Sequence, residues 1–140
     1  MLADPLKILI ADDDAGVRDL VCIRLRIAGY DPHMAKNGRE AVERAVKLRP
    51  AAMILDINMP ELDGFGVLSE MQDKAPEIQV PTLVLTARQS SDDVRMAVAL
   101  GARGYLTKPF TEAQLLARVT RLFRGRTLSR EIDEEDVVEI

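Results

Sequence analysis

The chain has 140 residues, of which 47% are hydrophobic and 30% charged, and its formal net charge is −4. This length and composition are typical of one domain with a proper apolar core. No apolar run approaches the ~18 residues that span a membrane, and no charged-then-apolar leader is seen, so we expect a cytoplasmic protein without a membrane span. The single cysteine, Cys22, excludes an internal disulfide, and we expect it to be buried in a reducing compartment.

Short apolar runs alternate with segments of helical periodicity along the chain. The runs predict strands over residues 7–11, 31–35, 51–55, 82–85 and 104–106. Helices are expected over residues 17–28, 41–46, 64–73 and 91–100, and a last one is expected to begin after Thr111 and carry Leu115, Leu116, Val119 and Leu122. Breakers close three of these helices: Gly29, Pro50 and Gly101.

Five βα units in about 124 residues predict an α/β fold built on a doubly wound, five-stranded parallel sheet. The natural strand order for this number of units is 2-1-3-4-5, as in flavodoxin-like folds. We expect one domain at residues 1–124, followed at residues 125–140 by a tail that is first arginine-rich and then acidic. No effector domain is expected after it.

Polar residues follow four of the predicted strands. Asp12, Asp13 and Asp14 follow the first strand, and Asp56 follows the third. The fourth and fifth strands end in hydroxyl or ammonium groups, supplied by Thr86, Thr107 and Lys108. Because parallel strands place their carboxyl ends at one edge of the sheet, we expect these groups to converge where the first and third strands adjoin.

Such a cluster has an excess of negative charge. Asp12, Asp13 and Asp56 carry three negative charges, and Lys108 offsets only one of them. A hard divalent cation would neutralise the remainder, and an all-oxygen site with few protein ligands suits Mg²⁺. With Lys108 and the hydroxyl of Thr86 at hand for phosphoryl oxygens, Asp56 is predicted to be the nucleophile of a phosphoryl transfer.

Each residue also has a simpler interpretation. The three aspartates at 12–14 could cap the following helix, and this is the role that we expect for Asp14. Lys108 alone could be a surface lysine, and Thr86 alone a β-branched strand residue. Because all of them are placed at strand ends of one fold, we favour a shared functional site over separate residues without a common function.

The motifs that carry this chemistry resemble those of the receiver domain of two-component response regulators, especially the stand-alone type related to the chemotaxis protein CheY. The resemblance covers about residues 6–124. It rests on ILIADDD at 8–14, ILDINMPELDG at 54–64, LVLTA at 83–87 and YLTKPF at 105–110. The expected function is therefore that of a single-domain phosphoacceptor in a phosphorelay, rather than that of an enzyme.

The resemblance implies that Asp56 accepts a phosphoryl group from a sensor histidine kinase or a phosphotransfer protein. Asp13, Asp56 and the backbone carbonyl of Asn58 would hold Mg²⁺, with Asp12 contributing through water. Such proteins assist both their own phosphorylation and their own dephosphorylation, which is slow. When phosphorylated, they bind a downstream protein target.

The resemblance also implies how the phosphorylated state is sensed. Lys108, Thr86 and the backbone amides of Asn58 and Ala87 would contact the phosphoryl group. Thr86 would move toward it while Tyr105 swings inward, which is a bistable element biased by a new anion. Tyr105 could instead be a half-buried strand aromatic without a switching role. The bond between Lys108 and Pro109 is expected to be cis.

A phosphatase of the haloacid dehalogenase type is the alternative within aspartyl-phosphate chemistry. Those enzymes resemble this chain in using a strand-end aspartate and Mg²⁺. They need a second aspartate two residues after the nucleophile as general acid, and this chain has Asn58 there. Their nucleophile also ends the first strand, whereas Asp56 ends the third. We therefore expect a persistent acyl phosphate, which suits a signal.

The end of the chain allows two interpretations. Its arginines are Arg118, Arg121, Arg124, Arg126 and Arg130, and six acidic residues follow them. A solvated helix end with a frayed acidic tail is the simpler one. The other is a phosphate-binding cluster, because the stretch resembles the arginine-rich segment of a CheY-like subgroup that binds cyclic di-GMP. Binding of DNA is not expected, and the protein is expected to be a monomer or weak dimer.

Overall fold

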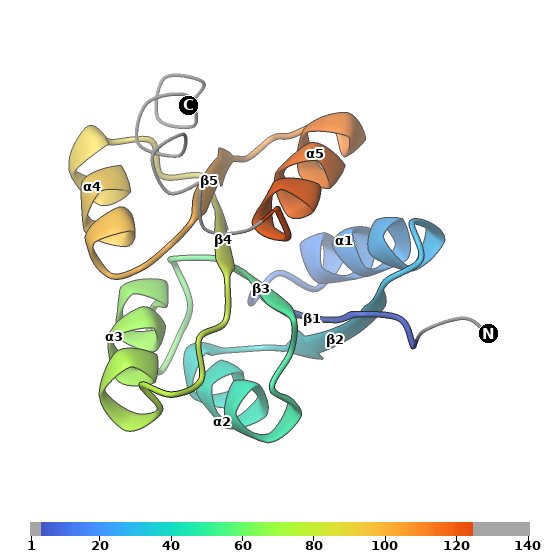
Figure 1. Cartoon of the computed structure of the whole chain (residues 1–140). Helices are drawn as coiled ribbons and strands as arrows, with labels where there is room; N and C mark the ends of the chain where they lie inside the picture. Colours follow the sequence, from blue (N-terminus) through green and yellow to red (C-terminus); the bar gives the residue numbers. More distant parts are fainter. Residues whose placement is uncertain (1–3, 125–140) are drawn as a thin grey trace.

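The computed structural model describes residues 4–124, in which five strands alternate with five helices (Figure 1). The strands are β1 (Lys7–Ala11), β2 (Asp31–Ala35), β3 (Ala52–Leu55), β4 (Thr82–Thr86) and β5 (Gly104–Thr107). The helices are α1 (Ala15–Ile27), α2 (Gly38–Leu48), α3 (Gly64–Lys74), α4 (Ser91–Ala99) and α5 (Glu112–Leu122). All strand pairs are parallel and their order is β2-β1-β3-β4-β5, which confirms the predicted topology.

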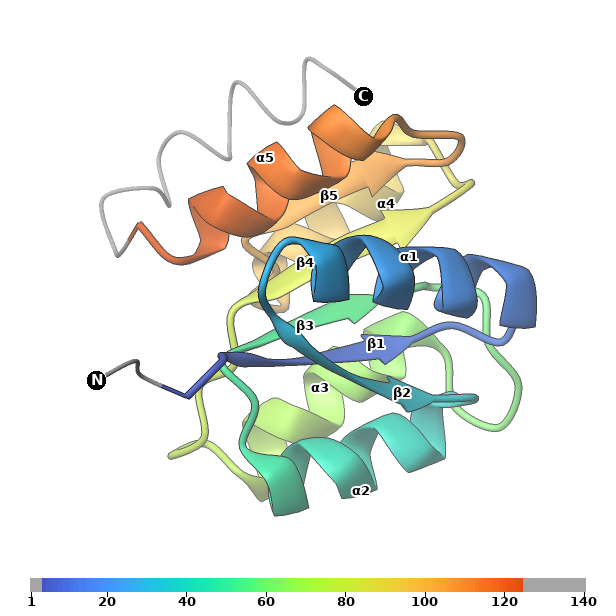
Figure 2. The same cartoon turned by 90° about the vertical axis from the view of Figure 1, so that its right-hand side faces the viewer.

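Helices cover both faces of the sheet (Figures 1 and 2). Helices α1 and α5 pack on one face, and α2, α3 and α4 pack on the other. The two apolar layers that result consist mainly of aliphatic side chains, and every residue of β3 and β4 is buried. A parallel sheet covered on both faces needs such continuous apolar strands. The two central strands therefore hold the residues that follow them in fixed positions.

Side-chain caps fix where the helices beside the carboxyl edge of the sheet begin. The Asp14 carboxylate accepts hydrogen bonds from the backbone N–H groups of Gly16 (2.8 Å) and Val17 (3.2 Å), which confirms its predicted role as a cap. Thr111 and Gln114 form a reciprocal capping box at the start of α5, where Thr111 was expected to cap the helix.

Two large apolar side chains within the predicted helices lie at the surface. Leu20 on α1 is 44% exposed and Val46 on α2 is 40% exposed, so neither belongs to the core. On α1 the buried positions are Val21 and Leu25, which share the predicted helical spacing, and Cys22, which was expected to be buried. Periodicity alone cannot define the edge of an apolar face to better than one residue. None of the helices within residues 4–124 is long and apolar enough to cross a membrane.

The loop after β3 approaches the start of α3 very closely. A Cβ atom at Gly64 would lie 2.5 Å from the carbonyl oxygen of Asp56 and 2.7 Å from the Cα of Ile57. The N–H of Gly64 donates to the carbonyl of Ile57 at 2.8 Å. Only a residue without a side chain fits this contact, so Gly64 sets the distance between α3 and the backbone of Asp56.

Replacement of Gly64 by alanine tests this contact. The Cβ would meet backbone atoms that cannot rotate away, so we expect Gly64→Ala to lower the free energy of unfolding by about 1–3 kcal/mol. Gly16→Ala is the matched control, because the nearest atom to its Cβ is the Asp14 side chain at 3.3 Å. Urea denaturation should show a lower midpoint for the first variant only, and equal midpoints would contradict the contact.

Candidate functional site

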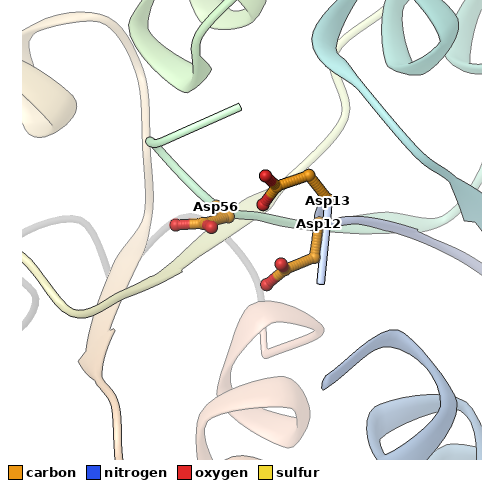
Figure 3. A group of neighbouring side chains, drawn as sticks. All are labelled: Asp12, Asp13 and Asp56. Atoms are coloured by element: carbon orange, nitrogen blue, oxygen red, sulfur yellow. The ribbon is translucent and has the colours of Figure 1, made fainter. Parts of the chain in front are cut away.

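The carboxylates predicted to converge lie together at the carboxyl edge of the sheet. Ala11 at the end of β1 pairs with Leu55 at the end of β3, so the residues that follow these two strands are neighbours. Oxygen atoms of Asp12, Asp13 and Asp56 lie within 4.8 Å of one another (Figure 3). Asp12 and Asp56 are buried, whereas Asp13 is exposed. The cluster is thus open to solvent on the side of Asp13.

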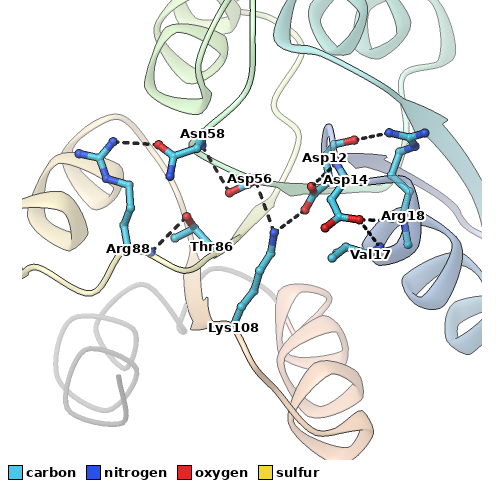
Figure 4. Close-up of polar contacts among 10 residues, drawn as sticks. Asp12, Asp14, Val17, Arg18, Asp56, Asn58, Thr86, Arg88 and Lys108 are labelled. Atoms are coloured by element: carbon cyan, nitrogen blue, oxygen red, sulfur yellow. Dashed lines mark hydrogen bonds and ion pairs between the residues drawn. The ribbon is translucent and has the colours of Figure 1, made fainter.

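The ammonium group of Lys108 joins two of these carboxylates (Figure 4). Its Nζ lies 2.8 Å from Oδ2 of Asp12 and 3.4 Å from Oδ2 of Asp56. The backbone N–H of Lys108 donates to the carbonyl of Thr86 at 2.9 Å, which fixes the residue next to the end of β4. The Lys108–Pro109 bond is cis, as expected. One cation therefore serves two acidic side chains from different strands.

Burial and charge act in opposite directions on these groups. Burial raises the pKa of Asp12, and the hydrogen bonds from Lys108 and from the backbone N–H of Asp14 offset only part of that effect. Burial lowers the pKa of Lys108, but the hydrogen bond to Asp12 and the charges of Asp56 and Asp12 outweigh it, so the net direction is upward. Lys108 therefore stays protonated at neutral pH.

The donor set of this cluster fits a hard divalent cation. Three carboxylates face one another, and the single ammonium of Lys108 cannot neutralise them. Oxygen ligands in this number, with one side open to solvent, are those that Mg²⁺ prefers, because it keeps several water molecules. The residues that would hold it are Asp12, Asp13 and Asp56.

Two further groups of the predicted site lie beside Asp56. The backbone N–H of Asn58 is 3.4 Å from Oδ1 of Asp56, which places this amide next to the carboxylate. Thr86 is fully buried at the end of β4, and its hydroxyl oxygen lies 3.4 Å from the backbone N–H of Arg88. The roles of the Asn58 carbonyl and of the Ala87 amide stay predictions.

Arg88 makes a network that the motifs did not reveal. Its guanidinium binds the Asp93 carboxylate through two hydrogen bonds of 2.9 and 2.8 Å, and it donates to Oδ1 of Asn58 at 3.3 Å (Figure 4 shows the latter). It also lies 5.6 Å from the centre of the Phe65 ring, within the range of a cation–π contact. Arg88 thus connects the loop after β4 with α3, α4 and the loop after Asp56.

Tyr105 is buried rather than half-buried. It is 1% exposed, and its hydroxyl donates to the backbone carbonyl of Arg88 at 2.9 Å. The alternative interpretation of Tyr105 as a half-buried strand aromatic is therefore wrong about its burial. The ring points inward, toward the loop that carries Thr86 and Arg88.

Arg118 does not form part of a solvent-facing cluster. It is 6% exposed, and its Nη1 donates to the backbone carbonyl of Tyr105 at 2.6 Å. This guanidinium holds α5 against β5. The role of Arg118 in binding a nucleotide stays a prediction. Arg121 lies in the last turn of α5 and Arg124 follows the helix. Arg126 and Arg130 lie outside the described residues, and the cyclic di-GMP hypothesis gains no support from the described ones.

Comparison with known proteins agrees with this geometry. The family model of the response regulator receiver domain matches residues 8–120. Among curated proteins, the transcriptional regulatory protein PrrA of Mycobacterium leprae is 42% identical over 120 residues, which are 86% of this chain and 51% of PrrA. The DNA-binding dual master transcriptional regulator RpaA of Synechocystis is 41% identical over 118 residues, covering 84% of this chain and 49% of RpaA.

Solved structures show the same fold. The chemotaxis response regulator CheY4 of Vibrio cholerae is similar with a TM-score of 0.79 and 34% identity, covering 85% of this chain and 99% of CheY4. CheY in a complex with CheX, BeF3 and Mg from Borrelia burgdorferi is similar with a TM-score of 0.81 and 25% identity, covering 86% and 91% of the two chains.

The curated relatives are longer than this chain, which spans about half the length of PrrA and RpaA. The match of the family model nevertheless covers the five strands and helices except the first residue of β1 and the last two of α5, and it includes Asp12, Asp13, Asp56, Thr86 and Lys108. We conclude that the chain belongs to the receiver domains of two-component response regulators, with a CheY-like fold.

Proposed function

We propose that Asp56 is the phosphoacceptor of this receiver domain and that phosphorylation switches a protein-binding face. The observation that carries the proposal is the placement of Asp56 within a cluster of three carboxylates whose shared cation, Lys108, reaches it at 3.4 Å. Phosphoryl transfer depends mainly on positioning and charge stabilisation, which this arrangement supplies.

The reaction is a transfer from a phosphohistidine to a carboxylate. An oxygen of Asp56 attacks the phosphorus, the P–N bond breaks, and the imidazole of the donor leaves with its electron pair. Asp12, Asp13, Asp56 and the carbonyl of Asn58 would hold Mg²⁺, which would supply positive charge at the phosphoryl oxygens. Lys108 can move its ammonium from Asp56 to the new phosphoryl group while it keeps Asp12 as a partner.

The amides and the hydroxyl beside Asp56 complete the binding of the phosphoryl group. The N–H of Asn58 already faces the carboxylate, and the N–H of Ala87 and the hydroxyl of Thr86 lie at the end of β4. The Asn58 side chain is neither an acid nor a base, and it accepts a hydrogen bond from Arg88. We therefore infer an acyl phosphate that persists rather than one that turns over quickly, with slow self-catalysed dephosphorylation.

The switch links Thr86 to Tyr105 through Arg88. Thr86 contacts the N–H of Arg88, and Tyr105 donates to the carbonyl of the same residue. A shift of Thr86 toward a phosphoryl group would move this peptide segment, and the hydroxyl of Tyr105 would respond. The geometry described here, with Tyr105 inward, corresponds to the state that phosphorylation is expected to stabilise.

The partners of the domain follow from its family. Receiver domains interact with histidine kinases and with downstream targets. For this chain we propose a sensor histidine kinase or phosphotransfer protein as donor and a protein target on the face of α4, β5 and α5. The complex of Borrelia burgdorferi CheY with CheX, BeF3 and Mg supports a protein target for the activated form.

The organisation of the whole chain is also a proposal. We propose a receiver domain at residues 1–124 and a separate tail at 125–140, in a cytoplasmic protein that is a monomer or weak dimer. Two relatives are transcriptional regulators of which the match covers about half, so an output without DNA stays a prediction. Binding of cyclic di-GMP by Arg118, Arg121, Arg124, Arg126 and Arg130 also stays a prediction, which titration with the nucleotide would test.

Removal of the Asp56 carboxylate tests the phosphoacceptor. We expect Asp56→Asn to abolish labelling by a small-molecule phosphodonor with Mg²⁺, because the amide cannot form the acyl phosphate. Asp14→Asn is the matched control: it removes one charge nearby but keeps a side chain that caps α1. Labelled protein is measured by mass spectrometry. Substantial labelling of Asp56→Asn at another residue would overturn the assignment.

The environment of Tyr105 predicts an unusual titration. Burial raises the pKa of Tyr105 to about 12. Because the folded pKa exceeds the ordinary value of 10.0, the stability that Tyr105 contributes is complete below pH 10 and is lost as the pH rises toward 12. In Tyr30→Phe, where Tyr105 is the only tyrosine, the phenolate absorbance should rise near pH 12. A midpoint near pH 10 in folded protein would contradict the burial.

A further inference from the structure

An open pocket lies at the amino edge of the sheet, opposite to the edge that carries the carboxylate cluster. Its volume is about 390 Å³, and its walls include residues of α3, of the loop between α3 and β4, and of the turn between α4 and β5. In Figure 2 this loop lies at the side of the sheet where the strand arrows begin. Thr82, the first residue of β4, lines the pocket, whereas Thr86 ends the same strand about 13 Å away. The pocket is therefore separate from the phosphorylation site.

The lining of this pocket is mainly apolar. It includes Met53, Leu68 and Met71 of the buried core, and Ile78 and Leu100, which are only partly buried. A ligand that covers the partly buried side chains gains free energy by removing apolar surface from water. The volume is also within the range of about 300–1,000 Å³ that is usual for sites of small molecules. The pocket is thus suited to a small molecule with an apolar body.

The loop between α3 and β4 is held in place without a ligand. It contains Pro76 and Pro81, whose rings fix the backbone dihedral φ at both positions. The hydroxyl of Thr82 donates a hydrogen bond to the carbonyl of Val80 at 2.9 Å. A ligand would therefore find the wall of the pocket already formed, which lowers the entropy that is lost on binding.

Arg103 brings a positive charge to this apolar lining. Of the described residues that line the pocket, only Arg103 is charged. Its backbone N–H donates to the carbonyl of Thr82 at 2.9 Å, which fixes it beside the start of β4. The residue is half-buried, and within residues 4–124 its guanidinium has neither a hydrogen bond nor an ion pair. A cation that is partly withdrawn from water is stabilised by an anion.

The surroundings of Arg103 favour an anion with one charge. The other polar side chains of the lining are neutral, and that of Gln72 already donates to the carbonyl of Leu100 at 2.8 Å. A guanidinium binds a carboxylate through two parallel hydrogen bonds, which matches the two groups in charge and geometry. A phosphate group with two charges would leave one of them uncompensated among apolar side chains. The chemistry of the pocket thus fits a monocarboxylate.

We propose that this pocket binds a small carboxylic acid with an apolar body, such as a medium-chain fatty acid. The carboxylate pairs with Arg103, and the apolar body covers Ile78 and Leu100. The ligand thereby joins the loop before β4 to the turn before β5. This inference goes beyond the phosphorelay function and does not depend on it, so it is tested on unphosphorylated protein without Mg²⁺.

Titration of the isotope-labelled full chain with octanoate tests the site by NMR. We expect saturable shifts in the amide signals of Gln79, Gly101 and Arg103, and unchanged signals of Asp13 and Asn58 at the opposite edge of the sheet. Octanamide has the same carbon skeleton without the charge and is the matched control ligand. We expect it to bind roughly 10-fold more weakly, because it loses the hydrogen bonds between two charged groups.

Two arginine variants separate the charge of Arg103 from the net charge of the protein. Arg103→Gln should weaken octanoate by the same factor of roughly 10 and leave octanamide unchanged, since the backbone contact with Thr82 is kept. Arg95→Gln is the matched control, because Arg95 lies on α4 with a side chain that is 77% exposed and does not line the pocket. It should bind octanoate as the unmodified chain does.

The outcomes that contradict the proposal are equally specific. Equal affinities for octanoate and octanamide would overturn it, as would an affinity for octanoate that Arg103→Gln leaves unchanged while the variant keeps the spectrum of a folded protein. Shifts that centre away from the pocket would also overturn it. The same holds if no saturation is reached below the concentration at which octanoate forms micelles.

Discussion

The geometry of the site depends on the attraction between one ammonium group and two buried carboxylates. Parallel strands end at the same edge of the sheet, so the order β2-β1-β3-β4-β5 forces the residues after β1 and β3 together. Without a cation, the repulsion between Asp12 and Asp56 would oppose folding of this edge. Lys108, which follows β5, reaches both carboxylates with its ammonium group and offsets part of the repulsion between them. What remains is a local excess of negative charge that attracts a metal ion.

Arg88 plays a second cationic role at the rim of the same edge. Its side chain is bound to Asp93, its neighbour is the ring of Phe65, and its backbone carbonyl accepts from Tyr105. Lys108 contacts the Asp56 carboxylate directly, whereas Arg88 contacts residues of α3, α4 and β5 around the site. The two cations therefore lie in different parts of the site: Lys108 within the carboxylate cluster and Arg88 at its rim.

The sequence was sufficient for the fold and for the acidic cluster because both follow from repeated local patterns. Apolar runs with polar ends predict strands, their order follows from the number of units, and the position of Asp56 follows from that order. The contacts of Arg88 could not be predicted, because they join residues from Asn58 to Tyr105 whose separation carries no local signal. The burial of Arg118 could not be predicted for a related reason: its hydrogen bond to the carbonyl of Tyr105 joins a helix to a strand and leaves no local pattern in the sequence.

The close approach at Gly64 has a mechanical consequence. The backbone of Asp56 and Ile57 touches the first turn of α3 without an intervening side chain, so the two segments have little room to move relative to each other. Phe65, the next residue, lies against the guanidinium of Arg88. A displacement of the backbone at Asp56 would therefore be passed to the start of α3 and, through Phe65, to Arg88. A change at Asp56 could thus reach Arg88 through two sets of contacts: one through Gly64 and Phe65, and one through Thr86.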